Sequence, residues 1–210
     1  MRVVEIFDSL QGEGVWAGVP MTFLRLAGCN APELGLGCLE WCDTRDAWGP
    51  GAGSERSIDS VAAEVRFPRC CVTGGEPLLQ EEEVSLLVAA LHLRGVLVHL
   101  ETNGTLVPRF SPLADWITVS PKPPVYDVTP ELGRVAAEVK VIVDARLACL
   151  GLEEASERVR EIVRPFADAQ VCLQPEASGG PGLVRMTADL VMAHPKWRLS
   201  LQLHKIVGIR

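Results

Sequence analysis

The sequence predicts an α/β fold in the form of a partial, incomplete TIM-like barrel. Segments with strand character alternate with helical segments along the 210 residues, which is the pattern of a mostly parallel sheet. Six predicted strands end in a polar or glycine-rich cluster, and in parallel barrels these carboxyl ends meet at one mouth and form the active site. Clear helices are fewer than strands, so we expect the barrel to be incomplete or flattened.

Composition excludes several classes of protein. The apolar share of 48% supports a packed core in one domain over residues 1–210, with an N-terminal strand and a C-terminal strand extension. The net charge of −7 argues against a nucleic-acid-binding surface. No apolar run approaches the roughly 20 residues of a membrane span, and no signal-peptide core opens the chain. We therefore expect a cytoplasmic protein with reduced cysteines that binds neither nucleic acid nor membranes.

The N-terminal segment carries two features that suit a ligand. After a predicted strand at residues 2–7, the turn SLQGEG holds two glycines that permit close approach of a ligand, although an ordinary hairpin turn is the simpler explanation of this turn alone. The next predicted strand, 21–26, places Arg25 among apolar residues. A buried, unpaired charge there would cost about 3–5 kcal/mol, so we expect an ion pair with Glu5 or Glu13, or a clamp for a substrate carboxylate.

The loop that follows carries Cys29, Cys38 and Cys42, with eight and then three residues between them. Three thiols on one loop indicate a metal site. A structural zinc site normally has four ligands at shorter spacings. Three thiolates leave one metal position open, which suits a site where another molecule binds the metal; a structural zinc or interaction module is the alternative.

The middle of the chain continues the alternation. A Gly- and Pro-containing loop at 48–56 leads to a helix that Ser57 is expected to cap. A buried strand at 69–72 follows, in which adjacent Cys70 and Cys71 point to opposite faces and pack in the core. The TGGEP motif at its end exposes consecutive amides that suit a carboxylate, and Glu76 there can accept from an ammonium group; a plain strand-to-helix turn is the alternative.

The second half repeats the strand–helix format. Apolar residues at helical spacing predict a helix over 84–91 that ends at Gly95, with His92 on its surface. Residues 105–115 are too short and proline-rich for a crossover helix. The further predicted elements are strands at 96–105, 116–122, 136–144 (with Glu138 and Lys140 on one face), 170–176 and 197–205 (ending in His204), helices at 153–163 and 187–193, and a loop at 177–182.

The motifs LRLAGCN, WCDT, TGGEP, ETNGT and VSPK, in this order, resemble the radical S-adenosylmethionine enzymes. Within them, LQGEG near the start and LHK near the end resemble the 7-carboxy-7-deazaguanine synthases, and the likeness runs from about residue 3 to residue 208. The usual cysteine spacing in the superfamily is C-x3-C-x2-C, and both gaps differ here. Cys70 or Cys71 is therefore kept as an alternative ligand.

The resemblance implies a partial barrel of the radical S-adenosylmethionine type with three cofactors. Cys29, Cys38 and Cys42 would hold a [4Fe-4S] cluster whose fourth iron binds S-adenosylmethionine, and Thr44 would bind Mg2+. Iron–sulfur potentials span roughly −700 to +450 mV, and reductive cleavage of the sulfonium requires the low end. The resulting adenosyl radical abstracts hydrogen, so the barrel mouth must exclude water and oxygen.

The resemblance also assigns binding residues, without naming a catalytic one. For S-adenosylmethionine these are Trp41, Cys42, Asp43, Gly75, Ser120, Pro121, Lys122, Gln174, Pro175, Glu176 and Ala177. For the substrate they are Leu10, Gln11, Gly12, Arg25, Thr73 and the carboxylate of Arg210, with Glu13, Glu101, Asn103 and His204 as second choices.

The implied reaction converts 6-carboxy-5,6,7,8-tetrahydropterin to 7-carboxy-7-deazaguanine with loss of ammonia, in the queuosine (deazapurine) pathway. Hydrogen abstraction starts it, a Mg2+-assisted ring contraction follows, and the returned hydrogen regenerates the cofactor. We expect an electron donor such as flavodoxin or ferredoxin, and a homodimer, because a partial barrel leaves apolar edges. A glycyl-radical activating enzyme would form the same cluster, but LQGEG and Arg25 favour a small anionic pterin over a protein substrate.

Overall fold

A computed structural model describes residues 1–49 and 51–209 of the chain. In this part, nine strands form one sheet in the order β3-β1-β2-β4-β5-β6-β7-β8-β9. From β2 onwards the neighbours run parallel, whereas β1 pairs antiparallel with β2 and β3. The strands are β1 Arg2–Leu10, β2 Pro20–Leu26, β3 Ser54–Glu55, β4 Arg69–Gly74, β5 Leu97–Thr102, β6 Trp116–Val119, β7 Glu138–Val143, β8 Gln170–Pro175 and β9 Arg198–Leu199.

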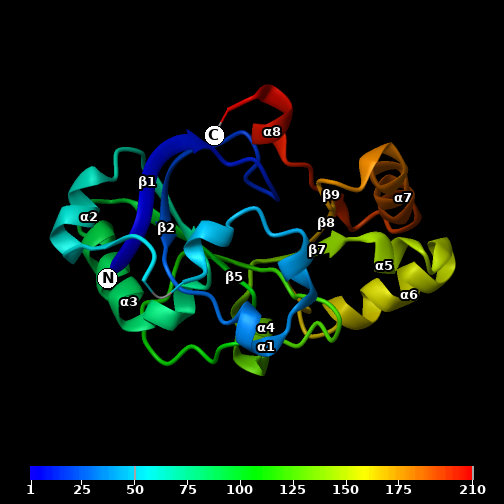
Figure 1. Cartoon of the computed structure of the whole chain (residues 1–210), viewed down its shortest axis with the longest axis horizontal. Helices are drawn as coiled ribbons and strands as arrows, with labels where there is room; N and C mark the ends of the chain where they lie inside the picture. The colour runs from blue at the N-terminus through cyan, green and yellow to red at the C-terminus, as the bar shows by residue number, and fades with distance from the viewer. Residues whose placement is uncertain (50, 210) are drawn as a thin grey trace.

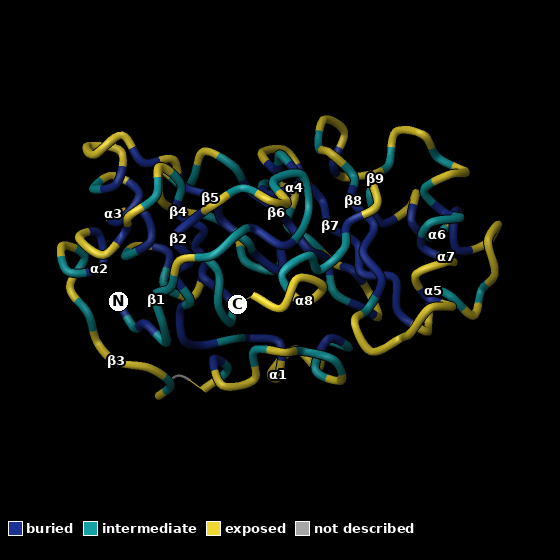
Figure 2. Tube along the Cα trace, turned by 90° about the horizontal axis from the view of Figure 1, so that it is seen from above, coloured by how far each residue is buried: buried dark blue, intermediate teal, exposed yellow. Residues whose placement is uncertain are grey.

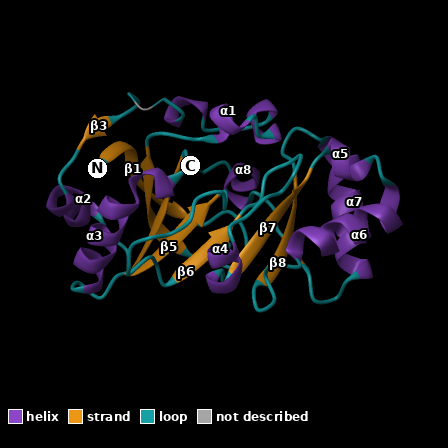
Figure 3. Ribbon diagram, turned by 90° about the horizontal axis from the view of Figure 1, so that it is seen from below, coloured by secondary structure: helices purple, strands orange, loops and turns teal. Residues whose placement is uncertain are grey.

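The sheet does not close into a full barrel; α2 and α3 lie at one end of it and α5, α6 and α7 at the other, as Figures 1 and 3 show. This confirms the predicted α/β fold with an incomplete barrel. The α-helices are α1 Ala31–Leu34, α2 Ile58–Glu64, α3 Glu81–His92, α4 Pro130–Val135, α5 Ala145–Ala148, α6 Gly151–Val163, α7 Gly180–Ala193 and α8 Leu203–Val207. Short 3-10 helices span Gly37–Glu40, Arg45–Ala47 and Pro77–Gln80.

The core lies between the parallel strands and the helices, and Figure 2 shows strands such as β4 and β7 as largely buried. Leu24, Val72, Leu100 and Val141 are fully buried in it. Each such side chain contributes about 1.5–3 kcal/mol when it leaves water. Because strand residues alternate, their neighbours along the chain point to the opposite, concave face, and that face carries the polar residues of the site.

Several predicted features are confirmed. Ser57 caps α2 through a 3.2 Å bond from the Ser60 amide to its hydroxyl. Cys70 packs in the main core, and Cys71 packs on the other face with Met21 and Phe23. Residues 105–115 form no helix.

The C-terminal strand is shorter than predicted. β9 ends at Leu199, and the Ser200 amide then bonds the Leu173 carbonyl at 2.8 Å while the Ser200 hydroxyl bonds Gln174 at 2.7 Å. The chain turns there and continues as α8, so His204 lies on a helix. The prediction of a strand over 197–205 is therefore wrong beyond Leu199, because the chain turns into α8 and leaves the edge of the sheet.

Helical structure also begins where the sequence indicated loops. α7 starts at Gly180, within the predicted loop 177–182, because the proline that follows is tolerated in a first helical turn. The loop 48–56 contains β3, which pairs with β1. α1, α4 and α5 were not predicted, and their four to six residues are too few for a periodic pattern.

The loop between β1 and β2 reaches across the concave face to the far strands. The Gly14 amide donates to the Ser200 hydroxyl at 2.8 Å, and the Val15 amide donates to Glu138 of β7 at 3.1 Å. Gly14 has φ +66°, and a Cβ there would lie 2.1 Å from a Glu138 oxygen, so glycine is required at this contact. Among the described residues, none of the helices is both long and apolar enough to cross a membrane.

Candidate active site at the carboxyl ends of the strands

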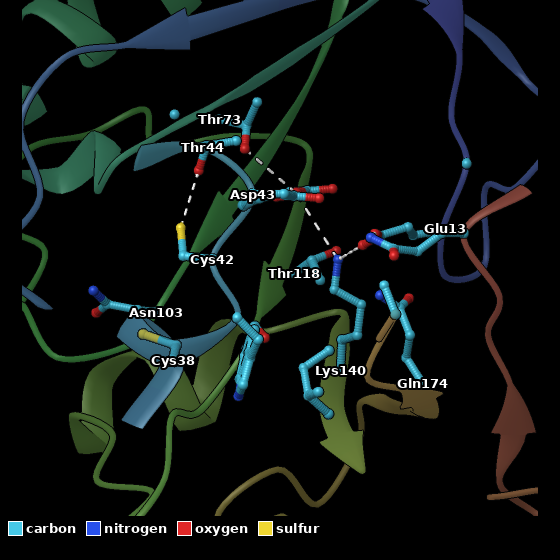
Figure 4. Close-up of a pocket in the computed structure, with 18 of the residues that line it drawn as sticks. Glu13, Cys38, Cys42, Asp43, Thr44, Thr73, Asn103, Thr118, Lys140 and Gln174 are labelled. Carbon is cyan, nitrogen blue, oxygen red and sulfur yellow. Dashed lines mark hydrogen bonds and ion pairs between the residues drawn. The ribbon is translucent and has the colours of Figure 1, made fainter. Parts of the chain in front are cut away.

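A cavity of about 480 Å³ opens at the carboxyl ends of the strands. Residues from the β1–β2 loop, the cysteine loop, the parallel strands and α8 line it, and Figure 4 shows part of this wall. Pro121 does not line it, and Arg210 lies outside the described residues. The predicted site residues that line the cavity are Leu10, Gln11, Gly12, Glu13, Arg25, Cys29, Cys38, Trp41, Cys42, Asp43, Thr44, Thr73, Gly75, Glu101, Asn103, Ser120, Lys122, Gln174, Pro175, Glu176, Ala177 and His204.

The cysteine loop brings Cys29, Cys38 and Cys42 to this one cavity. The long first gap folds into α1 and the 3-10 helix Gly37–Glu40, which returns Cys38 to the cavity wall. Burial raises the pKa of the Cys29 thiol and the Cys38 thiol, and repulsion from Cys42 adds to the shift of each. By contrast, Cys70 and Cys71 are fully buried in the sheet and do not line the cavity, so the structure gives no support to them as alternative ligands.

The three cysteines do not form a single-ion site in the described part of the chain. Within residues 1–49 and 51–209, no three His, Cys, Asp or Glu side chains form a group that could hold one metal ion. A four-iron cluster is larger than an ion, and its thiolate ligands stand correspondingly farther apart. Cys29, Cys38 and Cys42 all line one cavity, which is compatible with such a cluster.

Backbone contacts fix the position of Cys29. The Gly28 amide bonds the Ala47 carbonyl at 2.7 Å and the Cys29 amide bonds the Trp48 carbonyl at 3.2 Å. On the other side, Gly75 lies so close that a Cβ there would be 1.9 Å from the Gly28 carbonyl oxygen. The two glycines of TGGEP therefore serve the close packing of two backbones.

The amides of TGGEP are engaged within the protein. The Gly75 amide donates to the Leu26 carbonyl at 3.1 Å, and the Glu76 amide donates to the Gly28 carbonyl at 2.7 Å. The prediction that these amides bind a carboxylate is wrong for this structure, because both already donate to backbone carbonyls at the end of β2 and in the loop that follows it.

Glu76 also differs from its predicted role as a partner for an ammonium group. It is fully buried, and its two oxygens accept from the Thr102 hydroxyl at 2.8 Å and the Asn103 amide at 2.7 Å. Burial raises its pKa, while these hydrogen bonds act in the opposite direction. Glu76 therefore holds the end of β5 against the TGGEP turn.

A row of polar side chains crosses the concave face. Arg25 of β2 pairs with Glu5 at 2.7 Å, which confirms one of the two predicted ion-pair partners, and it lines the cavity as well. This bond uses one of the five N–H donors of the guanidinium. Beside it, the Thr73 hydroxyl donates to Glu101 of β5 at 3.4 Å, and the amide group of Gln11 donates to the same carboxylate at 3.1 Å.

Trp41 and Lys122 form a second part of the wall. The Lys122 ammonium lies 5.7 Å from the centre of the Trp41 ring and donates to the Ser120 hydroxyl at 2.8 Å. Burial lowers the pKa of Lys122. The Trp41 indole N–H is buried without a hydrogen-bond partner in the structure, so a donor is available at this wall.

Lys140 is among the lining residues that sequence reasoning did not assign to the site. Lys140 of β7 lies at the cavity with its side chain 7% exposed, ion-paired with Glu13 and 3.9 Å from Glu101. The predicted shared face of Glu138 and Lys140 is correct, since both point to the β1–β2 loop. A lysine within the apolar run VKVIV is the same signal that singled out Arg25, and it was available in the sequence.

Comparisons with known proteins agree on one family. No family model matches the chain. A protein of Bacteroides thetaiotaomicron named 7-carboxy-7-deazaguanine synthase is 38% identical, with 100% of this chain and 98% of that protein covered. One of the same name from Bordetella pertussis is 36% identical over 99% of this chain and 98% of its own length. The crystal structure of QueE from Escherichia coli superposes with a TM-score of 0.76 at 27% identity, covering 97% of this chain and 94% of that one.

Proposed function

The chain belongs to the 7-carboxy-7-deazaguanine synthases, radical S-adenosylmethionine lyases of the queuosine pathway, and from that premise we propose how its cavity serves the reaction. The reaction converts 6-carboxy-5,6,7,8-tetrahydropterin to 7-carboxy-7-deazaguanine with release of ammonia. One observation carries the proposal: the three cysteines of one loop line the same cavity as the polar residues of the strand ends.

The cysteine loop is the proposed site of a [4Fe-4S] cluster on Cys29, Cys38 and Cys42. S-adenosylmethionine would lie along the wall formed by Trp41, Asp43, Gly75, Ser120, Lys122 and residues 174–177. The chemistry that these groups would supply when bound is reductive formation of an adenosyl radical, which would abstract a hydrogen atom from the substrate. The indole N–H of Trp41 and the ammonium of Lys122 offer donors to the cofactor.

The substrate is proposed to occupy the part of the cavity nearer to β2 and β5. Arg25 retains N–H donors for the substrate carboxylate besides the one that binds Glu5. Gln11 and Thr73 both donate to Glu101. These three side chains would offer hydrogen-bond donors and acceptors to the pterin ring of the substrate. Thr44, whose hydroxyl lies 3.4 Å from the Cys42 sulfur, would bind Mg2+ shared with substrate oxygens, because Mg2+ prefers oxygen ligands.

Two partners belong to the proposal. A low-potential electron donor such as flavodoxin or ferredoxin must reduce the cluster, and a second copy of the chain is proposed to form a homodimer.

Anaerobic reconstitution tests the function. The chain is loaded with iron and sulfide, mixed with S-adenosylmethionine, Mg2+, dithionite and the carboxypterin, and the deazaguanine product is measured by mass spectrometry. We expect a brown protein whose spectrum responds to S-adenosylmethionine and which forms the product. A brown protein without product would support a glycyl-radical activating enzyme, and a colourless protein with tightly held zinc would support a zinc module; either result rejects the proposal.

A further inference from the structure

Lys140 is the central cation of a buried ion cluster at the cavity. It lies on β7 in the interior of the barrel, and its ammonium group binds the Glu13 carboxylate. The same nitrogen lies 3.9 Å from Glu101 on β5 (Figure 4). The exposed fractions of the three side chains are 7%, 16% and 23%, so water screens these charges weakly.

The two carboxylates are held by further donors. Gln202, at the start of α8, donates its amide N–H to Glu13 at 2.7 Å. Gln11 and Thr73 donate to the two oxygens of Glu101 at 3.1 and 3.4 Å. Both carboxylates line the cavity, so they are fixed in place while facing the space that a ligand would fill.

An ionised carboxylate only accepts hydrogen bonds, whereas a protonated one also donates. A reduced pterin presents several N–H groups, which require acceptors at the site. Resting on the proposed function, we propose that Lys140 is a positioning residue for this reaction. It holds Glu13 and Glu101 ionised and in place as acceptors for the N–H groups of the substrate ring.

The charges around Glu13 support this role. Burial by itself would raise the pKa of Glu13, but the ion pair with Lys140 and the bond from Gln202 lower it to about 2. Without the cation, burial dominates and the pKa rises. The other charged or titratable groups that face this pair from neighbouring elements are Cys71 on β4, His99 and Glu101 on β5, Lys122 after β6, Glu138 on β7 and Cys172 on β8.

A purely structural role, that of fastening the β1–β2 loop, is already served by other bonds. The backbone amides of Gly14 and Val15 donate to Ser200 and Glu138, and the backbone amide of Gln11 donates to the Val19 carbonyl at 2.8 Å. The loop is therefore anchored at several points that do not involve Lys140.

The experiment compares cluster-loaded Lys140→Met, Lys140→Arg and the double variant E13Q/K140M with wild type. Lys196→Met, which places the same substitution on an exposed loop, is the matched control. KM and kcat are measured across pH, the affinity for the carboxypterin is measured by titration calorimetry with S-adenosylmethionine present, and Tm is recorded.

We expect Lys140→Met to raise KM and Kd by roughly 10- to 100-fold, the size of a lost hydrogen bond to a charged group. Its KM rises further as pH falls, because Glu13 becomes protonated and loses its acceptor character, while the wild-type KM stays level. Lys140→Arg, which keeps a cation, lies closer to wild type. In E13Q/K140M no charge is left unpaired at Glu13, so Tm recovers while KM stays high.

A wild-type KM in Lys140→Met, or a wild-type KM in E13Q/K140M alongside its recovered Tm, overturns the proposal, since the lysine would then serve stability alone. If Lys140→Met does not fold, the double variant and Lys140→Arg decide the question. Failure of the wild-type protein to form product would instead reject the proposed function, so the two failures are distinct.

Discussion

At the scale of single residues, the lack of a side chain at Gly75 lets the backbone pack closely against Cys29, a proposed cluster ligand. A Cβ there would press on the Gly28 carbonyl oxygen and lie 2.9 Å from the Cβ of Cys29. We predict that Gly75→Ala lowers stability by about 1–3 kcal/mol, as in other overpacked sites, and reduces the iron bound after reconstitution. Gly182→Ala, with open space around the new methyl group, is the control. Full iron content in Gly75→Ala would contradict the assigned packing role.

Thr44 offers a test of the metal that the family is expected to use. Its hydroxyl lines the cavity beside Cys42. Thr44→Ala should selectively weaken the dependence of the rate on Mg2+, whereas Thr44→Ser keeps the oxygen ligand and should behave like wild type. Titration of activity with Mg2+ measures this, and an unchanged Mg2+ dependence in Thr44→Ala would remove the assignment.

Glu13 makes stability depend on pH in a defined window. Its pKa falls from 4.5 to about 2 in the folded protein, so its contribution is complete above pH 4.5 and is lost as pH falls towards 2. At about 1.4 kcal/mol per unit, the contribution is about 3 kcal/mol. We predict that Glu13→Gln destabilises the cluster-free protein by this order at neutral pH and has little effect near pH 2. Denaturant unfolding across pH measures it, and a pH-independent difference would refute the ion-pair explanation.

At the scale of elements, α8 closes over the cavity next to the cysteine loop. Gln202, His204 and Lys205 line the cavity, and the Lys205 ammonium binds the Asp43 carboxylate at 2.6 Å. The Leu203 amide also bonds the Gly12 carbonyl at 2.8 Å, and a Cβ on Gly12 would collide with the His204 ring. The C-terminal helix therefore joins the cysteine loop to the β1–β2 loop, although the three segments are far apart in the sequence.

The bond between α8 and the cysteine loop is expected to affect cofactor affinity more than stability. Lys205 and Asp43 are 42% and 55% exposed, and such pairs contribute about 0.2–1 kcal/mol. Lys205→Met should weaken S-adenosylmethionine binding by about 2- to 5-fold at low salt, because Asp43 is no longer held. The difference should shrink at high salt, where the pair is screened. Calorimetry at two ionic strengths measures it; an effect that persists at high salt would argue against an electrostatic cause.

At the scale of the whole molecule, the open sheet leaves apolar side chains uncovered on its last elements. Met192 of α7, Leu199 of β9 and Ile206 of α8 are 65%, 40% and 66% exposed. A partial barrel with such surfaces gains from covering them with a second copy. We predict that sedimentation equilibrium gives twice the mass of one chain, and a monomer across the concentration range would reject the homodimer.

The sequence by itself determined the family and the α/β class with an incomplete barrel, because short motifs and local strand and helix patterns carry both. Ser57 as a cap and the buried pair Cys70–Cys71 follow from the same local patterns. Only the tertiary structure decided the partner of Lys140, since Glu13 lies on a distant loop across the barrel. The tertiary structure also decided that the TGGEP amides bind backbone carbonyls of the same protein, and that β9 ends at Leu199. The physical reason is that these hydrogen bonds and ion pairs join segments that only the packing of the sheet brings together. Local sequence periodicity carries no information about such contacts.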